Sequence, residues 1–162
     1  MAVDMFMKIA TVDGESTDKA HPKEIDVLAW SWGVSNSGTT HEGGGGGAGK
    51  ARVQDLSFTK YIDAASHALL IASTSGDHHA KANLVVRKAG GKGAPIEYIK
   101  IEMSEVLVTS VSCGGSGGQD RLTESVTLNF AKVKFEYTPQ KDDGTPGAAK
   151  TMNYDIAEND NS

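Results

Sequence analysis

The sequence predicts one mostly β domain with a single short α-helix, closed as a small barrel or an orthogonal sandwich. Apolar side chains alternate with a period of two along most of the chain, which is typical of half-buried strands. One segment, residues 63–76, has helical spacing instead. A strand predicted over 121–138 changes its apolar parity near Ala131, which requires a bulge, a sharp bend or a passage between two sheets.

The predicted strands cover residues 3–12, 25–35, 52–59, 79–88, 96–112, 121–138 and 150–156. In the second of these, one face keeps two tryptophans, so we expect that face to fill a deep core. The opposite face tapers through small residues, which are Ala29, Ser31, Gly33 and Ser35. Since this tapering face cannot fill a deep core, we expect it to meet something outside the monomer.

The predicted helix places several alanines and a leucine on one face, namely Ala65, Ala68, Leu69 and Ala72. Asp63 is positioned to cap its N-terminus, and Gly76 can take the left-handed position after its C-terminus. Residues 36–50 show no periodicity and include a run of five glycines, so we expect an extended exposed loop there. Residues 158–162 are expected to be a frayed tail.

Length and charge limit the possible classes of protein. The chain of 162 residues is near the usual size of one domain, so we expect a single domain over 1–162. The net charge of −5 repels phosphate backbones and anionic lipids, which argues against nucleic acid and membrane as partners. The first residues lack the basic and apolar regions of a signal peptide, so we expect synthesis in the cytoplasm without one.

Two glycine motifs match enzyme patterns without the structural context that those patterns need. Gly44 to Lys50 has the spacing of a phosphate-binding loop, but Ala51 replaces the hydroxyl residue and a strand, not a helix, is predicted to follow. Gly114 to Gly118 fits the G-x-S-x-G nucleophile elbow around Ser116, yet a strand follows it as well. We therefore expect a flexible loop and a glycine-rich hairpin connection.

The remaining reactive side chains form no pattern of catalysis or metal binding. His78 and His79 are adjacent in a predicted strand and point to opposite faces, so they cannot share a metal ion. Cys113 has the parity of buried residues and is expected to be a small buried hydrophobe. We expect no catalytic residues, no metal site and no cofactor.

Several segments together resemble the Hcp (haemolysin-coregulated) proteins. They are Asp4 to Ile9, Gly14 to Ser16, Glu24 to Gly33, and Phe58 to Lys60 before the alanine-rich helix. The most specific is the acidic and aliphatic run into Trp30-Ser31-Trp32-Gly33, which β-propensity alone does not explain. The resemblance covers nearly the whole chain.

This resemblance implies the inner-tube subunit of a bacterial type VI secretion system. It implies an antiparallel β-barrel of two sheets with one short α-helix, assembling as a hexameric ring that stacks into a tube. The implied partners are further copies of the chain, a spike protein, a contractile sheath and small effectors carried in the lumen. It also implies a protein that is made in the cytoplasm and secreted without turnover of a substrate.

Within such an assembly, we expect loops to gather at the ends of the barrel, on the faces where rings stack. The expected loops are 37–50, 89–94, 114–119 and 142–147, and the candidate stacking residues are Thr40, His41, Glu42, Lys50, Gly90 and Lys92. The tapering face, Ala29, Ser31, Gly33 and Ser35, is the candidate lumen surface. Two alternatives stay open: a monomeric or dimeric barrel that binds a small ligand, and a hydrolase that uses Ser116.

Overall fold

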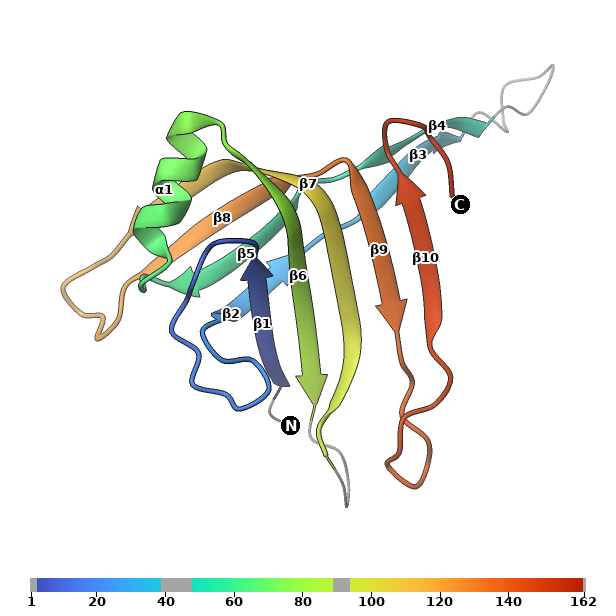
Figure 1. Ribbon diagram of the computed structural model, residues 1–162, viewed down its shortest axis with the longest axis horizontal. Helices are drawn as coiled ribbons and strands as arrows, with labels where there is room; N and C mark the ends of the chain where they lie inside the picture. Colours follow the sequence, from blue (N-terminus) through green and yellow to red (C-terminus); the bar gives the residue numbers. More distant parts are fainter. Residues whose placement is uncertain (1–2, 39–47, 89–93, 162) are drawn as a thin grey trace.

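The computed structural model describes residues 3–38, 48–88 and 94–161 (Figure 1). The strands are β1 (Val3–Ile9), β2 (Ile25–Ser31), β3 (Val34–Gly38), β4 (Ala48–Val53), β5 (Leu56–Tyr61), β6 (His78–Lys88), β7 (Ile96–Gly114), β8 (Thr123–Asn129), β9 (Lys132–Tyr137) and β10 (Lys150–Asp155). One helix, α1 (Ser66–Ser75), lies between β5 and β6. The expectation of a mostly β chain with a single short helix is confirmed for these residues.

Six antiparallel strands close into a barrel. Each strand pairs with the next around the circuit β1, β2, β5, β8, β7, β6 and back to β1. The two strands β9 and β10 extend from β7 outside this circuit, and β3 and β4 form a separate hairpin. Figure 1 shows that hairpin projecting from the barrel on the side of the β9 and β10 extension. The predicted barrel is confirmed, with four strands added to it.

The 19-residue strand β7 belongs to both the barrel and the extension. Its first half, Ile99 to Ser104, pairs with β9, and its second half, Leu107 to Gly114, pairs with β8 on the same edge. Glu105 lies between the halves with φ of 55°, a left-handed backbone that bends the strand. Across from it, the chain leaves β8 and enters β9 at Phe130 and Ala131. The corner predicted near Ala131 is therefore confirmed.

Apolar side chains fill the barrel interior. Each strand of the circuit contributes fully buried residues, among them Met7, Ile9, Ile25, Leu56, Phe58, Leu84, Ile101, Met103, Val106, Val126 and Leu128. The helix α1 packs against β7 and adds Ala65, Leu69 and Ala72 to the same core. Such close packing excludes water and makes apolar burial the main stabilising contribution.

The predicted second strand is interrupted by a bulge. The register with β5 shifts between Val27 and Ala29, so the buried residues are Ile25 and Val27 before the shift and Trp30 and Trp32, half-buried, after it. The expectation that a single parity fills the core along the whole strand is wrong, because Leu28 sits in the bulge and is exposed. The bulge explains why both faces of this segment are apolar in the sequence.

The segment 36–50 is more ordered than the sequence predicts. Asn36 pairs with Ala51 and Gly38 with Ala48, so the ladder of β3 and β4 enters both ends of the expected loop. Every residue of β3 is exposed, whereas Ala51 and Val53 of β4 are half-buried against the core. The central residues 39–47 lie outside the described part of the chain.

Three local expectations have different outcomes. The helix ends as predicted, because Gly76 has φ of 72° and its N–H donates to the carbonyl of Ala72. The expectation that Asp63 caps the N-terminus is wrong, because the N-cap is Ala65, without a side-chain hydrogen bond. Asp63 Oδ1 instead accepts from the backbone N–H of Ala65 at 2.9 Å, in the turn before the helix. The expectation for Cys113 is wrong, since this thiol is exposed. Cys113 keeps the parity of the half-buried Val111, but it lies one residue before the end of β7, where the neighbouring residues are exposed as well.

A buried ion pair joins two strands of the barrel. Lys60 on β5 and Glu124 on β8 are directly opposite each other, their side chains are inaccessible to solvent, and the Lys60 ammonium contacts the Glu124 carboxylate. The ammonium also lies 3.0 Å from Asp63 Oδ1 and donates to Ser66 Oγ at 3.2 Å. Because breaking such a pair leaves an uncompensated buried charge, it fixes this strand register and ties the start of α1 to the barrel.

Gly14, in the loop between β1 and β2, has no room for a side chain. A Cβ atom there would lie 2.5 Å from the backbone oxygen of Glu24. We expect Gly14→Ala to lower the free energy of unfolding by about 1–3 kcal/mol through overpacking, measured by denaturant unfolding. The control is Gly118→Ala, where a Cβ would meet nothing within 4 Å. Equal stability of the two variants would contradict this account of the loop.

Candidate functional site

One outward face of the barrel is covered by small hydroxyl side chains. The strand registers bring Ser31 opposite Ser57, Ser57 opposite Thr127, and Thr127 opposite Ser110. A second row parallel to the first joins residues of the same four strands: Ala29, Thr59, Ser125 and Ser112. We call these eight residues the hydroxyl face: Ala29, Ser31, Ser57, Thr59, Ser110, Ser112, Ser125 and Thr127.

The hydroxyl face is uncharged and carries only short side chains. Its side chains are exposed or half-buried, and the inward neighbours Leu56, Phe58 and Val126 hold its strands from behind. Within it, the hydroxyl oxygens of Ser57 and Thr127 lie 3.3 Å apart. Short hydroxyl side chains offer hydrogen-bond donors and acceptors without ionic attraction. The arrangement forms a polar, uncharged surface that can contact a second macromolecule without binding it through charge.

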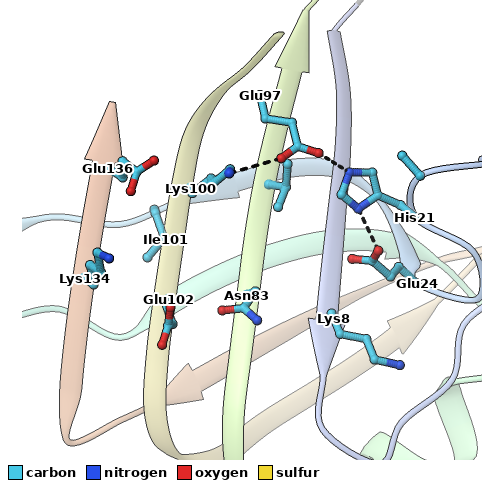
Figure 2. Close-up of a pocket in the computed structure, with 12 residues that line it drawn as sticks. Lys8, His21, Glu24, Asn83, Glu97, Lys100, Ile101, Glu102, Lys134 and Glu136 are labelled. Atoms are coloured by element: carbon cyan, nitrogen blue, oxygen red, sulfur yellow. Dashed lines mark hydrogen bonds and ion pairs between the residues drawn. The ribbon is translucent and has the colours of Figure 1, made fainter. Parts of the chain in front are cut away.

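The outward face of β1, β6, the first half of β7, and β9 has the opposite character. Its residues include Lys8, Lys81, Asn83, Lys100, Glu102, Lys134 and Glu136, which we call the charged face. Lys81 and Glu102 form an exposed ion pair of 2.6 Å. Figure 2 shows all of the charged-face side chains except Lys81 around a cavity of about 420 Å³. The loop between β1 and β2 borders the cavity and contributes His21 and Glu24.

Ion pairs on this side shift the titration of several groups. A hydrogen bond from Arg87 holds the pKa of Asp18 well below its usual value, and the same contact raises the pKa of Arg87. The Arg87 guanidinium lies 3.0 Å and 2.5 Å from the two Asp18 oxygens. A hydrogen bond from Lys81 lowers the pKa of Glu102. All these groups are ionised at neutral pH and link neighbouring segments electrostatically.

The structure brings together two of the four residues predicted for the lumen. Ala29 and Ser31 are exposed on β2 and belong to the hydroxyl face. Gly33 lies in the connection to β3, and Ser35 is exposed on β3 and pairs with Arg52 of the projecting hairpin. These two therefore lie beyond the barrel wall.

The candidate stacking residues are described in part. Lys50 is exposed on β4, in the hairpin that projects from the barrel (Figure 1). Thr40, His41, Glu42, Gly90 and Lys92 lie outside the described residues. The 142–147 loop lies beside Ala94 to Ile96, at the opposite end of the barrel wall from the hairpin, so the expected loops do not all share one end.

The enzyme-like motifs stay without a catalytic arrangement in the described residues. Ser116 is exposed in the hairpin connection between β7 and β8, with strands on both sides as predicted. No group of three or more His, Cys, Asp or Glu side chains within residues 3–38, 48–88 and 94–161 is placed to hold a metal ion. No helix in those ranges is long and apolar enough to cross a membrane.

Sequence reasoning found one strand of the hydroxyl face and missed the other three. Ser57, Thr59, Ser125 and Thr127 alternate with buried residues, which predicts only that they point outward. Their alignment with Ser31 depends on strand register and barrel closure, which bring together residues about 70 positions apart in the sequence, as the Ser57 and Thr127 pair shows. Hydroxyl residues at successive outward positions, Ser57 and Thr59 on β5 and Ser125 and Thr127 on β8, are the signal that could have found them.

The barrel has a filled interior, one uncharged outer face and one charged outer face. These features define the class of protein that acts through contacts between its outer surface and other macromolecules. A sequence model of the family described as "Type VI secretion system effector, Hcp" matches residues 6–137. The chain belongs to this Hcp family, whose members are secreted structural proteins of the type VI secretion system. The resemblance noted in the sequence is confirmed.

Individual relatives agree with this assignment. Protein hcp1 of Pseudomonas aeruginosa is 60% identical over 144 residues, which is 89% of this chain and 88% of the relative. A solved structure of a type six secretion system protein superposes with a TM-score of 0.92 at 32% identity, covering 99% of this chain and all of the other. Hcp1 from Salmonella typhimurium has a TM-score of 0.83 at 40% identity, with both chains fully covered.

The Asp18 and Arg87 pair predicts a specific response to acid. Because the folded pKa of Asp18 is lowered, its contribution to stability is present above about pH 4, the ordinary value, and is lost as pH falls through the folded value. We expect Asp18→Asn to lower the unfolding temperature at neutral pH. As the solution is acidified, the difference in unfolding temperature between the variant and the unaltered chain should become smaller. Thermal unfolding from about pH 7 to about pH 2 measures this.

The matched control is Asp13→Asn, which removes a more exposed carboxylate from the same loop. Its unfolding temperature should follow that of the unaltered chain across the same range, because exposed ion pairs contribute little. An Asp18→Asn difference that stays constant down to strong acid would contradict the assignment.

Proposed function

We propose that the chain is the tube subunit of its secretion system. In this proposal, six copies close into a ring, rings stack into a hollow tube, and the tube leaves the cell with a spike while a sheath contracts around it. Small effector proteins travel inside. The family assignment supports the secretion system, and the hydroxyl face supports the role of a conduit wall.

The hydroxyl face carries the argument for the inner wall. A lumen must let cargo enter, stay and leave, so its wall should offer many weak contacts and no strong charge attraction. Ser31, Ser57 and Ser125 supply short polar groups on adjacent strands of the barrel. The charged face would hold cargo of opposite charge more tightly and would repel cargo of like charge. We therefore assign the hydroxyl face to the lumen.

The hairpin of β3 and β4 is assigned to contacts between rings. It projects from the barrel, and among the described residues its two strands pair only with each other, so a single barrel leaves the polar backbone of the hairpin edge unpaired. Repeated heterologous contacts of this kind generate a stack when each ring offers the same surface to the next. Individually weak contacts are summed over six subunits and many layers.

A small-ligand carrier is the other function considered, and the packing gives it no support. Such a carrier needs an apolar internal cavity. Here the barrel interior is occupied by large side chains such as Phe58, Met103 and Leu128, each at most 2% exposed.

Light scattering of the purified chain separates the two functions. The tube subunit should have a mass near six times the 17.0 kDa of the monomer, whereas a carrier should be a monomer or a dimer. A mass of one or two chains at every concentration tested, together with no annular particles by electron microscopy, would contradict the tube proposal.

A positive charge on the hydroxyl face should impair transport and spare assembly. We expect Ser125→Lys to leave the ring mass and secretion of the subunit unchanged while lowering secretion of small effectors several-fold. The reason is that a long charged side chain narrows the lumen and changes the electrostatic field inside it. Ring mass and the secreted proteins of the source bacterium are measured.

Thr151→Lys is the matched control, since Thr151 is exposed on β10 opposite Glu136 of the charged face. It should secrete effectors normally. If Ser125→Lys breaks the ring into monomers, the hydroxyl face is a subunit interface and not a lumen wall.

Charge reversal in the projecting hairpin should weaken the stacking of rings. We expect Lys50→Glu to shorten tubes and leave single rings intact, because it places an opposite charge in every contact between layers. Tube length by electron microscopy and ring mass by light scattering test this, with Lys19→Glu in the exposed loop between β1 and β2 as control. Rings that fall to monomers with Lys50→Glu would show that the hairpin contacts neighbours within a ring.

A further inference from the structure

The buried ion pair of Lys60 and Glu124 differs from the other residue pairs between β5 and β8. Three pairs of buried, inward-facing residues join these strands, and they are Leu56 with Leu128, Phe58 with Val126, and Lys60 with Glu124. The first two are apolar and interchangeable, because each brings one large hydrophobic side chain against another. The third pair joins two opposite charges in the same row.

Apolar burial in this ladder is compatible with more than one alignment of the two strands. A slip of β8 along β5 by two residues leaves every side chain on its own face, because strand side chains alternate with a period of two. An apolar side chain again meets an apolar one, as when Val126 moves to Leu56. On the outward face a hydroxyl again meets a hydroxyl, as when Ser125 moves to Ser57. Neither face of the ladder therefore distinguishes the registers.

The ion pair does distinguish them. After a slip, Glu124 would lie opposite Phe58 or beyond the end of β5. Lys60 would stay beside Asp63, whose Oδ1 lies 3.0 Å from the ammonium, and Glu124 would lose its cation. In the observed register the buried Glu124 carboxylate accepts from Lys60 and, at 2.7 Å, from Ser66 Oγ. A buried carboxylate without these partners is strongly unfavourable, so the charges oppose every slipped alignment.

The ladders on either side of this strand pair are irregular. The ladder of β2 with β5 shifts register between Val27 and Ala29, and the ladder of β7 with β8 shifts between Val108 and Ser110. A bulge absorbs a change of alignment between neighbouring strands. The flanking ladders therefore constrain β5 and β8 over short runs of residues.

Two further contacts depend on the position of β8. Asn129 donates to Asp55 Oδ1 at 2.8 Å, and because this hydrogen bond is exposed, water can replace it at little cost. Phe130, which is 4% exposed, is buried at the corner where the chain leaves β8. Phe130 is thus the main competitor of the ion pair as the residue that fixes the register, and the experiment must separate the two.

We propose that Lys60 and Glu124 are positioning residues that select the register of β5 and β8. Apolar burial stabilises the barrel, and the ion pair makes one alignment unique. The selected register places Ser57 opposite Thr127 on the hydroxyl face. The consequence for a lumen wall rests on the proposed function, whereas the selection of the register is a property of the single chain.

The register is read by disulfide trapping in the full chain with Cys113→Ser, which removes its single cysteine. Residues directly opposite each other in an antiparallel pair are close enough for a disulfide, and diagonal neighbours are too far apart. Ser57→Cys with Thr127→Cys reports the observed register. Ser57→Cys with Ser125→Cys reports a slip in one direction, and Thr59→Cys with Thr127→Cys reports a slip in the other. Cross-linked peptides are quantified by mass spectrometry after mild oxidation.

The decisive variant replaces both charges, as Lys60→Met with Glu124→Leu. With the ion pair intact, we expect the cross-link of the observed register alone. In the double variant we expect slipped cross-links to rise several-fold, while the urea midpoint of unfolding stays at or above that of the unaltered chain, because apolar residues replace a buried ion pair well. The control is Lys81→Met with Glu102→Leu, which removes an exposed ion pair and should give no slipped cross-link.

Three outcomes would overturn the proposal. The cross-link of the observed register alone in the double variant would show that Phe130 and the corner fix the alignment without Lys60 and Glu124. A double variant that does not fold would show that the pair is required for stability and not for the choice of register. Slipped cross-links in the chain with the pair intact would show that the pair does not select. None of these results changes the expected ring mass, so the tube proposal is tested separately.

Discussion

The whole architecture depends on one strand that changes partners halfway along its length. β7 pairs with β6 on one edge from Ile96 to Leu107, while its other edge pairs first with β9 and then with β8. The left-handed backbone at Glu105 bends the strand between these partners. Because of this bend, β8 can reach β5 and close the barrel while β9 and β10 continue outward. A straight β7 would give an open sheet without an interior.

Closure of the barrel also separates two surface chemistries. The half formed by β2, β5, β8 and the end of β7 presents hydroxyl groups, and the half formed by β1, β6, the start of β7 and β9 presents paired charges. The same period of two that buries Phe58 and Val126 points Ser57 and Ser125 outward. Strand alternation therefore builds both the core and the proposed conduit wall. The charged half, in turn, anchors the loop that carries His21.

The sequence predicts the fold better than the surfaces, for physical reasons. The parity change near Ala131 predicts the corner, because the buried face of a strand is apolar and the sequence therefore shows which residues face the core. The bulge at Leu28 cannot be predicted in the same way, since apolar residues stand on both parities there. Every residue of β3 is exposed, so this strand has no hydrophobic pattern from which its ladder with β4 could be predicted. The pairing of buried Lys60 with Glu124, 64 residues away, needs the strand register.

The central claim is that the hydroxyl face forms the inner wall of a ring of identical chains. A cryo-electron microscopy reconstruction of the assembled protein tests it most directly. The account predicts a six-fold ring in which Ser31, Ser57 and Ser125 border the central opening and the charged face with His21 lies away from it. A ring whose opening is lined by Lys100 and Glu102, with the hydroxyl residues turned outward, would contradict it.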